Sequence, residues 1–110
     1  MKREKVDAWM ALSRGGDVAA RRQAIRELCP CQVRVDHSDV WMRCIEMTRD
    51  PDVKVRRHAL HALCDGSPRA YEGLIVAALE AMRDDSDPKL RRRVRKVLAS
   101  HRRDGNLNVL

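Results

Sequence analysis

Apolar side chains recur along most of the chain every three to four residues, a spacing that places them on one face of a helix. In the segment DVKVRRHALHALC (residues 52–64), one arc of the helical wheel is apolar, and the opposite arc consists almost entirely of Lys, Arg and His. The alternation in Val33-Arg34-Val35 is too short to predict a strand. The pattern therefore predicts an all-α protein.

Glycine and proline divide this pattern into six predicted helices. An Asp or Ser followed by Pro, as in Asp50-Pro51, Ser67-Pro68 and Asp87-Pro88, is typical of a helix N-cap and first turn. Residues 31–37 (CQVRVDH) are expected to form an irregular link. The predicted helices cover approximately residues 4–14, 17–29, 38–49, 50–66, 67–84 and 87–105.

Three segments repeat one another at a fixed offset of 35 residues, beginning at Asp17, Asp52 and Asp87. They read DVAARRQAIREL, DVKVRRHALHAL and DPKLRRRVRKVL, and they align without a gap. Each begins with Asp, carries an arginine pair at the same place and ends with Leu. Two helices per unit at a fixed period are typical of an α-solenoid.

The second segment resembles the second helix of a HEAT repeat. Its pattern D-x-x-V-R-x-x-A-x-x-x-L is formed by Asp52, Val55, Arg56, Ala59 and Leu63. The chain is most similar to the short bacterial HEAT-like type. The resemblance implies an α-solenoid of three HEAT-like helix pairs in a right-handed superhelical stack, acting as a scaffold or binding surface. We expect one domain over residues 1–110, with repeats at about 4–29, 38–65 and 68–104.

Basic side chains occupy the arc opposite the apolar arc in all three predicted second helices. The resemblance implies that these helices line the concave side of the solenoid, where they would present one basic ridge about 20 Å long. Reversal of Arg57 and Arg92 to Glu is expected to remove partner binding and leave the fold intact. The ridge is predicted to consist of Arg22, Arg26, Lys54, Arg57, His58, His61, Lys89, Arg92, Arg93 and Lys96.

A second set of arginines lies at the margin of the apolar arc, and we expect it to be mainly structural. It consists of Arg21, Arg56 and Arg91. Asp50 and Asp85 precede the last two by six residues. The resemblance implies that such positions are tied together as an internal ladder. Loss of these arginines would leave turn carboxylates or carbonyls without a partner.

The third repeat carries a charge where the others are apolar, since Arg95 corresponds to Ile25 and Leu60. A polar outer face is typical of a terminal repeat. We therefore expect the solenoid to end here, with residues 106–110 (NLNVL) folding back over part of that end. The alternative is that these residues form a small docking tail.

The formal net charge of +7 favours an anionic partner. An acidic protein surface or amphipathic helix is the partner we expect in the basic groove. The alternative is backbone-directed binding of nucleic acid through the same face. The three aromatic residues, Trp9, Trp41 and Tyr71, do not lie on the ridge, so base stacking is not expected.

The cysteines present a further alternative, a small zinc or redox site around Cys29-Pro30-Cys31. Candidate ligands are Cys29, Cys31, His37 and Cys64. Against this site, Cys29 and Cys64 are repeat equivalents and should lie about 10 Å apart, whereas sulfurs that share one zinc lie within about 4 Å. Buried or capping thiols are therefore the favoured interpretation, and no cofactor is expected.

The chain lacks a glycine-rich phosphate loop and a nucleophile motif, so we expect no enzymatic activity. No signal peptide is evident, and the longest apolar run, residues 74–79, is too short to span a membrane. These features predict a cytoplasmic protein that does not bind membranes.

Overall fold

The computed structural model describes residues 1–33 and 37–110, apart from the side chains of residues 31 and 32. Within these ranges every regular element is helical, which confirms the all-α prediction. The elements are α1 (Arg3–Ser13), α2 (Val18–Glu27), α3 (Pro30–Val33), α4 (Ser38–Met47), α5 (Val53–Leu63), the 3₁₀ helix η1 (Arg69–Tyr71), α6 (Glu72–Ala81) and α7 (Pro88–Asp104).

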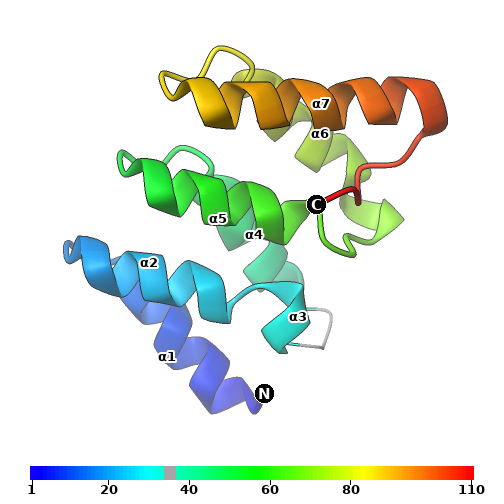
Figure 1. Cartoon of the computed structure of the whole chain (residues 1–110). Helices are drawn as coiled ribbons and strands as arrows, with labels where there is room; N and C mark the ends of the chain where they lie inside the picture. The colour runs from blue at the N-terminus through cyan, green and yellow to red at the C-terminus, as the bar shows by residue number, and fades with distance from the viewer. Residues whose placement is uncertain (34–36) are drawn as a thin grey trace.

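The longer helices form two layers (Figure 1). The second helices α2, α5 and α7 lie one above another in the front layer, with α1, α4 and α6 behind them. Each second helix packs on the first helix of its own repeat: α2 on α1, α5 on α4 and α7 on α6. This stack of helix pairs is the helical solenoid that the 35-residue offset predicts.

The core between the layers is aliphatic, because the repeating Leu, Ile and Val positions point inward from every helix. Leu28, Leu63 and Leu98 end the three repeated segments, and all three are buried. Trp41 adds an aromatic contact, because it stacks on Tyr71 with ring centroids 5.6 Å apart. The stack thereby joins α4 of the second repeat to the 3₁₀ helix η1 that precedes α6.

The link between the first two repeats contains a short helix, α3, where the sequence predicts irregular structure. Proline suits the first position of a helix because it needs no partner for an N–H, and Pro30 occupies that position. The Val33 amide donates to the Cys29 carbonyl (3.1 Å), and the Val33 side chain is buried. One turn is too short to give a periodic signal. The rest of the predicted link, residues 34–36, lies outside the described residues.

Each second helix is capped by the aspartate that begins its repeated segment, and the sequence predicts these caps only in part. Asp87 caps α7, with Pro88 at the first helical position, as predicted. For α5, however, the predicted cap at Asp50 is wrong, because the Asp52 carboxylate accepts the hydrogen bond from the Val55 amide (3.0 Å). Asp50 instead accepts from the Asp52 amide (2.9 Å) and holds the turn in place.

Arginines near the start of the second helices bind aspartates in the turn of the following repeat. Arg21 reaches both oxygens of Asp50 (2.9 and 3.3 Å), and Arg56 reaches both oxygens of Asp85 (2.9 and 3.1 Å). All four side chains are at most 13% exposed. Bidentate pairs of this kind are directional, so they set the orientation of one repeat on the next. We call these two pairs the inner ladder.

The inner ladder differs from the predicted one in its register. The sequence associates Arg56 with Asp50, six residues earlier, but Asp50 offers it only a backbone carbonyl, at 3.0 Å. The carboxylate partner comes from the next repeat. Arg91, the equivalent of Arg56 in the third repeat, donates to the Asp85 carbonyl (2.7 Å) and has no carboxylate partner among the described residues.

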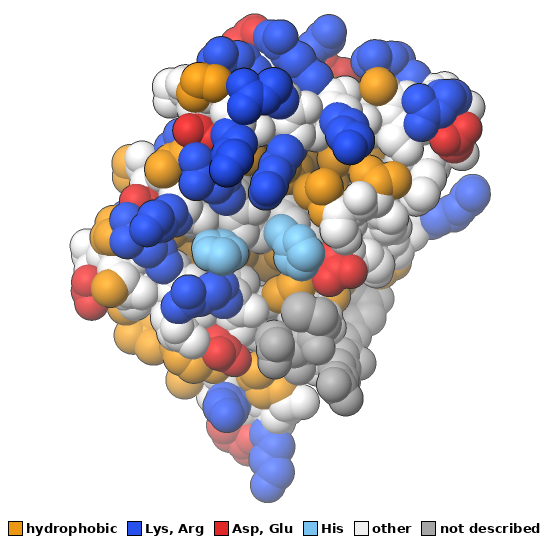
Figure 2. Space-filling model, in the orientation of Figure 1, with side chains coloured by type: hydrophobic (Ala, Val, Ile, Leu, Met, Phe, Trp, Pro, Cys, Tyr) orange, Lys and Arg blue, Asp and Glu red, His pale blue; other side chains and the backbone are white. Residues whose placement is uncertain are grey.

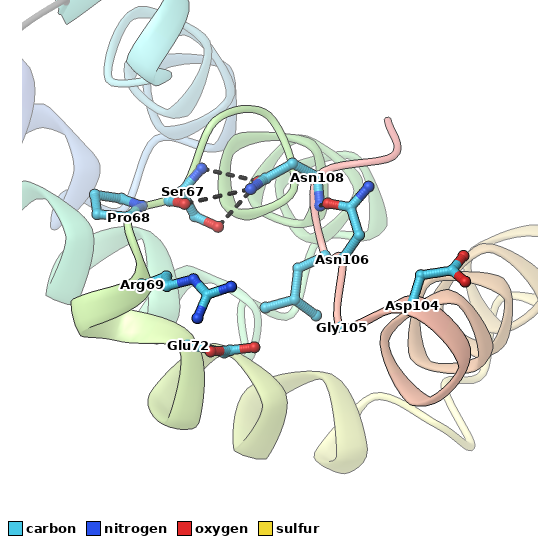
Figure 3. A pocket seen from close by; sticks show the side chains of 9 residues that line it. Ser67, Pro68, Arg69, Glu72, Asp104, Gly105, Asn106 and Asn108 are labelled. Atoms are coloured by element: carbon cyan, nitrogen blue, oxygen red, sulfur yellow. Dashed lines mark hydrogen bonds between the residues drawn. The ribbon is translucent and has the colours of Figure 1, made fainter.

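The chain after α7 folds back, but its hydrogen bonds go to the turn after α5 (Figure 3), whereas the sequence predicts that it covers part of the outer end of the third repeat. Asn108 Oδ1 accepts from the amides of Gly66 (3.0 Å) and Ser67 (2.8 Å) and from the Ser67 hydroxyl (3.0 Å). Ser67 is therefore a partner of the tail, whereas the sequence predicts it to begin a helix. Leu107 is 4% exposed, so the tail covers apolar surface. A pocket of about 280 Å³ lies beside this contact.

We expect Arg56→Ala to lower the free energy of unfolding by about 3 kcal/mol, because it leaves the buried Asp85 carboxylate unpaired. The matched variant Arg91→Ala removes a hydrogen bond to a carbonyl and no carboxylate pair, and should cost about 1 kcal/mol or less. Urea unfolding followed by far-ultraviolet circular dichroism measures both. Equal losses in the two variants would contradict the role assigned to the inner ladder.

Candidate binding face

The predicted contact residues all lie on α2, α5 and α7 and belong to the front layer of the solenoid. The 35-residue offset aligns them in rows, for example Arg22 with Arg57 and Arg92. Lys and Arg side chains gather over this face, most densely over α7, and two histidines lie near its middle (Figure 2). The structure therefore places all ten residues on helices of the front layer, and their part in partner binding stays a prediction.

Two members of the predicted ridge are engaged inside the protein. Arg22 binds both oxygens of Asp52 (2.8 and 2.9 Å), and Arg57 donates to Asp87 (3.0 Å). These acceptors are the N-cap aspartates of the following second helices. We call the two pairs the outer ladder. Because their guanidinium groups already hold a carboxylate, Arg22 and Arg57 also join the repeats, a contact that the assignment to partner binding alone omits.

The outer ladder also changes the acidity of the capping aspartates. Hydrogen bonds from Arg22 hold the pKa of the Asp52 carboxyl far below its usual range. The pKa of Asp87 is also lowered, chiefly by the hydrogen bond from the Leu90 amide and then by Arg57. Both carboxylates therefore stay ionised at neutral pH. Arg92, the third member of this row, has no carboxylate partner among the described residues and is exposed.

A groove of about 510 Å³ opens on this face between α5 and α7. The reason is that α5 lies close along α2 but approaches α7 less closely. Long basic side chains line the groove with their apolar stems as well as their charged ends. The lining consists of Lys54, Arg57, His58, His61 and Arg93. All five are members of the predicted ridge, and no acidic side chain lines the groove.

The two groove histidines differ in their surroundings. His58 is partly buried, and this burial, together with the nearby Arg26 and His61, lowers the pKa of its imidazole below the ordinary value near 6.5. His61 is exposed, and its Nε2 lies 3.4 Å from Asp65 Oδ2. The positive charge of the groove at neutral pH therefore comes from Lys and Arg rather than from His58.

The remaining ridge members are exposed and surround the groove. They are Arg26, Lys89, Arg92 and Lys96. Arg26 donates to the amide oxygen of Gln23. Since no carboxylate pair is recorded for these cations among the described residues, their charges are available to an anionic partner.

Among the described side chains, the predicted metal ligands Cys29, His37 and Cys64 do not form a group of three close ligand atoms. Cys64 is fully buried, and burial raises the pKa of its thiol to about 12. His37 lies at the N-terminal end of α4, and the side chain of Cys31 lies outside the described residues. Cys29 is instead close to His61 and Asp65, and the three ligand atoms lie within 4.8 Å of one another. The sequence analysis missed Asp65, although His61 and Asp65 show the four-residue spacing of one helix face.

A family model for HEAT repeats matches residues 6–99 of the chain. This match covers most of the 110 residues and includes all three helix pairs. The chain belongs to the HEAT repeat family. HEAT repeats generally act as non-catalytic scaffolds for protein–protein interaction. Comparisons with curated proteins and with solved structures found no match.

The face formed by α2, α5 and α7 is thus the face of the second HEAT helices, and its rows follow the HEAT period. Among the described residues, no helix is both long and apolar enough to cross a membrane. The inner and outer ladders are formed by the adjacent arginine pairs that recur at the 35-residue offset, Arg21-Arg22 and Arg56-Arg57. The groove is lined by His58 and His61, which lie one and four residues after Arg57 in α5, together with Lys54 and Arg93.

We expect a proton NMR titration to give His58 a pKa below 6.5, because burial and nearby positive charge both disfavour the imidazolium. His58 then gains its charge only when the pH falls below that lowered value. Arg26→Gln should raise the pKa, although burial, the larger cause of the lowering, remains. Arg102→Gln, at the far end of α7, should leave it unchanged. A His58 pKa above 6.5 would contradict this description of the groove.

Proposed function

We propose that this HEAT protein is a non-catalytic adaptor that binds an acidic protein segment in the groove between α5 and α7. The observation that carries the proposal is the composition of the groove, whose five lining side chains are all Lys, Arg or His. An anion can be bound there by Lys54 and Arg93, which lie outside both ladders, so the ion pairs between the repeats stay intact. The basic face over α7 extends the same field beyond the groove.

An acidic amphipathic helix fits this groove better than an isolated anion. Its carboxylates would meet Lys54 and Arg93 on opposite walls, because one residue belongs to α5 and the other to α7. Its apolar side would pack on the stems of the long basic side chains. Electrostatic attraction from a chain of net charge +7 would speed the encounter with such a partner.

Nucleic acid is the competing partner, because phosphates are also recognised by exposed Lys and Arg. No aromatic side chain lines the groove, so stacking of single-stranded bases has no platform there. Binding of a duplex would depend on phosphate contacts alone and would show little sequence preference. The two partners are therefore distinguished by whether substitutions in the groove weaken binding of an acidic peptide or of duplex nucleic acid.

The structure changes the choice of test residues. Arg57→Glu would place a carboxylate against Asp87, 3.0 Å from the present guanidinium, and the repulsion would destabilise the stack. We therefore expect reversal of Arg57 to weaken the fold as well, in contrast to the expectation from the sequence. Lys54 and Arg93 are exposed groove residues outside both ladders, so their reversal tests the groove and not the fold.

We predict that Lys54→Glu combined with Arg93→Glu weakens binding of an acidic amphipathic peptide at least about tenfold, because like charges then face its carboxylates. Fluorescence anisotropy with a labelled peptide rich in Glu and Leu measures this affinity over a salt series, with duplex DNA tested in parallel. Circular dichroism should show unchanged helix content.

The matched control is Lys2→Glu combined with Lys5→Glu, which makes the same change in net charge at the start of α1. It should leave peptide binding nearly unchanged. If the groove and control variants weaken binding equally, only net charge matters and the groove has no special role. Tight duplex binding that only the groove variant removes would favour nucleic acid over an acidic protein.

A further inference from the structure

Three potential metal ligands meet where α2 and α5 end. Cys29 follows the last turn of α2, His61 lies in the last turn of α5, and Asp65 comes just after it. Asp65 Oδ2 lies 4.0 Å from Cys29 Sγ and 3.4 Å from His61 Nε2. All three ligand atoms lie within 4.8 Å of one another.

These distances approach those of a tetrahedral zinc site. Bonds of about 2.0 Å to nitrogen and oxygen and about 2.3 Å to sulfur place neighbouring ligand atoms roughly 3.3–3.8 Å apart. The separation of His61 and Asp65 already falls in this range, and that of Cys29 and Asp65 is only slightly longer. Because His61 and Asp65 are partly exposed, small side-chain rotations suffice to close the site.

The backbone favours a cation at the same place. The C-terminal ends of helices carry partial negative charge from carbonyl groups without intrahelical partners. Both α2 and α5 end beside this cluster, so two helix dipoles point their negative ends towards it. A carboxylate next to a thiol opposes formation of the thiolate, whereas a dication between them stabilises both. The arrangement therefore suits a metal ion better than a cysteine nucleophile.

The cluster occurs at one junction of the solenoid only. At the next junction the positions equivalent to Cys29, His61 and Asp65 are Cys64, Lys96 and Ser100. The cysteine is thus repeated, but both other ligands are lost. The packing of the repeats alone does not require a histidine and an aspartate here, which points to a purpose specific to this junction.

We propose that Cys29, His61 and Asp65 bind one divalent transition-metal ion, with zinc the best fit to a thiolate, an imidazole and a carboxylate. Three protein ligands leave a fourth position for water or for a group from a partner. Binding displaces the proton of the Cys29 thiol, so the affinity falls as the pH is lowered. The proposal is independent of peptide binding in the groove, although His61 borders both.

The test uses the whole chain, reduced and freed of metal with a chelator. Isothermal titration with Zn²⁺ should give one ion per chain. Titration with Co²⁺ should give a thiolate-to-cobalt charge-transfer band in the near ultraviolet and visible bands of the intensity typical of four-coordination. Cys29→Ser should abolish the charge-transfer band, and His61→Ala or Asp65→Asn should weaken binding at least about a hundredfold.

His58→Ala is the matched control, since it removes a neighbouring histidine on α5 that is not part of the cluster, and it should leave binding unchanged. Cys31→Ser should also retain the ion. Circular dichroism of each metal-free variant checks that its fold persists. Because His61 is exposed, His61→Ala should not disturb the hydrophobic core. The proposal is overturned if no stoichiometric binding occurs, or if binding survives the loss of His61 and Asp65.

Discussion

Ion pairs between an arginine of one repeat and an aspartate of the next, three of them bidentate, join the repeats of this solenoid. They come in two parallel ladders, with Arg21 and Arg56 in the inner one and Arg22 and Arg57 in the outer one. Aliphatic contacts between helices tolerate sliding and rotation, whereas a guanidinium that reaches both oxygens of a carboxylate does not. The outer ladder also binds the aspartates that cap the second helices, so helix initiation and repeat stacking depend on the same side chains.

This division of the arginines determines what the surface can do. In the first two repeats, both adjacent arginines bind aspartates of the following repeat. The cations left for a partner are Arg26, Lys54 and the exposed ridge residues of α7. The groove opens where α5 and α7 separate, so the same stacking geometry that engages Arg57 leaves Lys54 and Arg93 exposed. The positive face therefore consists mainly of the basic side chains that do not pair with an aspartate of the next repeat.

The repeat made the fold predictable, because identical spacing of Asp, Arg pairs and Leu over three units leaves few alternatives to stacked helix pairs. The face of the ten basic residues was predictable for the same reason. Periodicity could not distinguish Arg22 from Arg26, since both lie on the polar arc and only the position of Asp52 in the next repeat separates them. Cys29 meets His61 and Asp65 only because the ends of α2 and α5 pack together. The spacing of cysteines along the chain does not predict this contact.

The central claim, that ridge arginines in line with an N-cap aspartate are structural, is tested most directly by a double-mutant cycle. Arg22→Gln and Asp52→Asn, alone and together, would be compared by urea unfolding, since Asn preserves the helix cap and removes only the charge. The account predicts that each single change destabilises the protein and that the double variant loses less than the sum. Additive losses, with no coupling between the two positions, would contradict it.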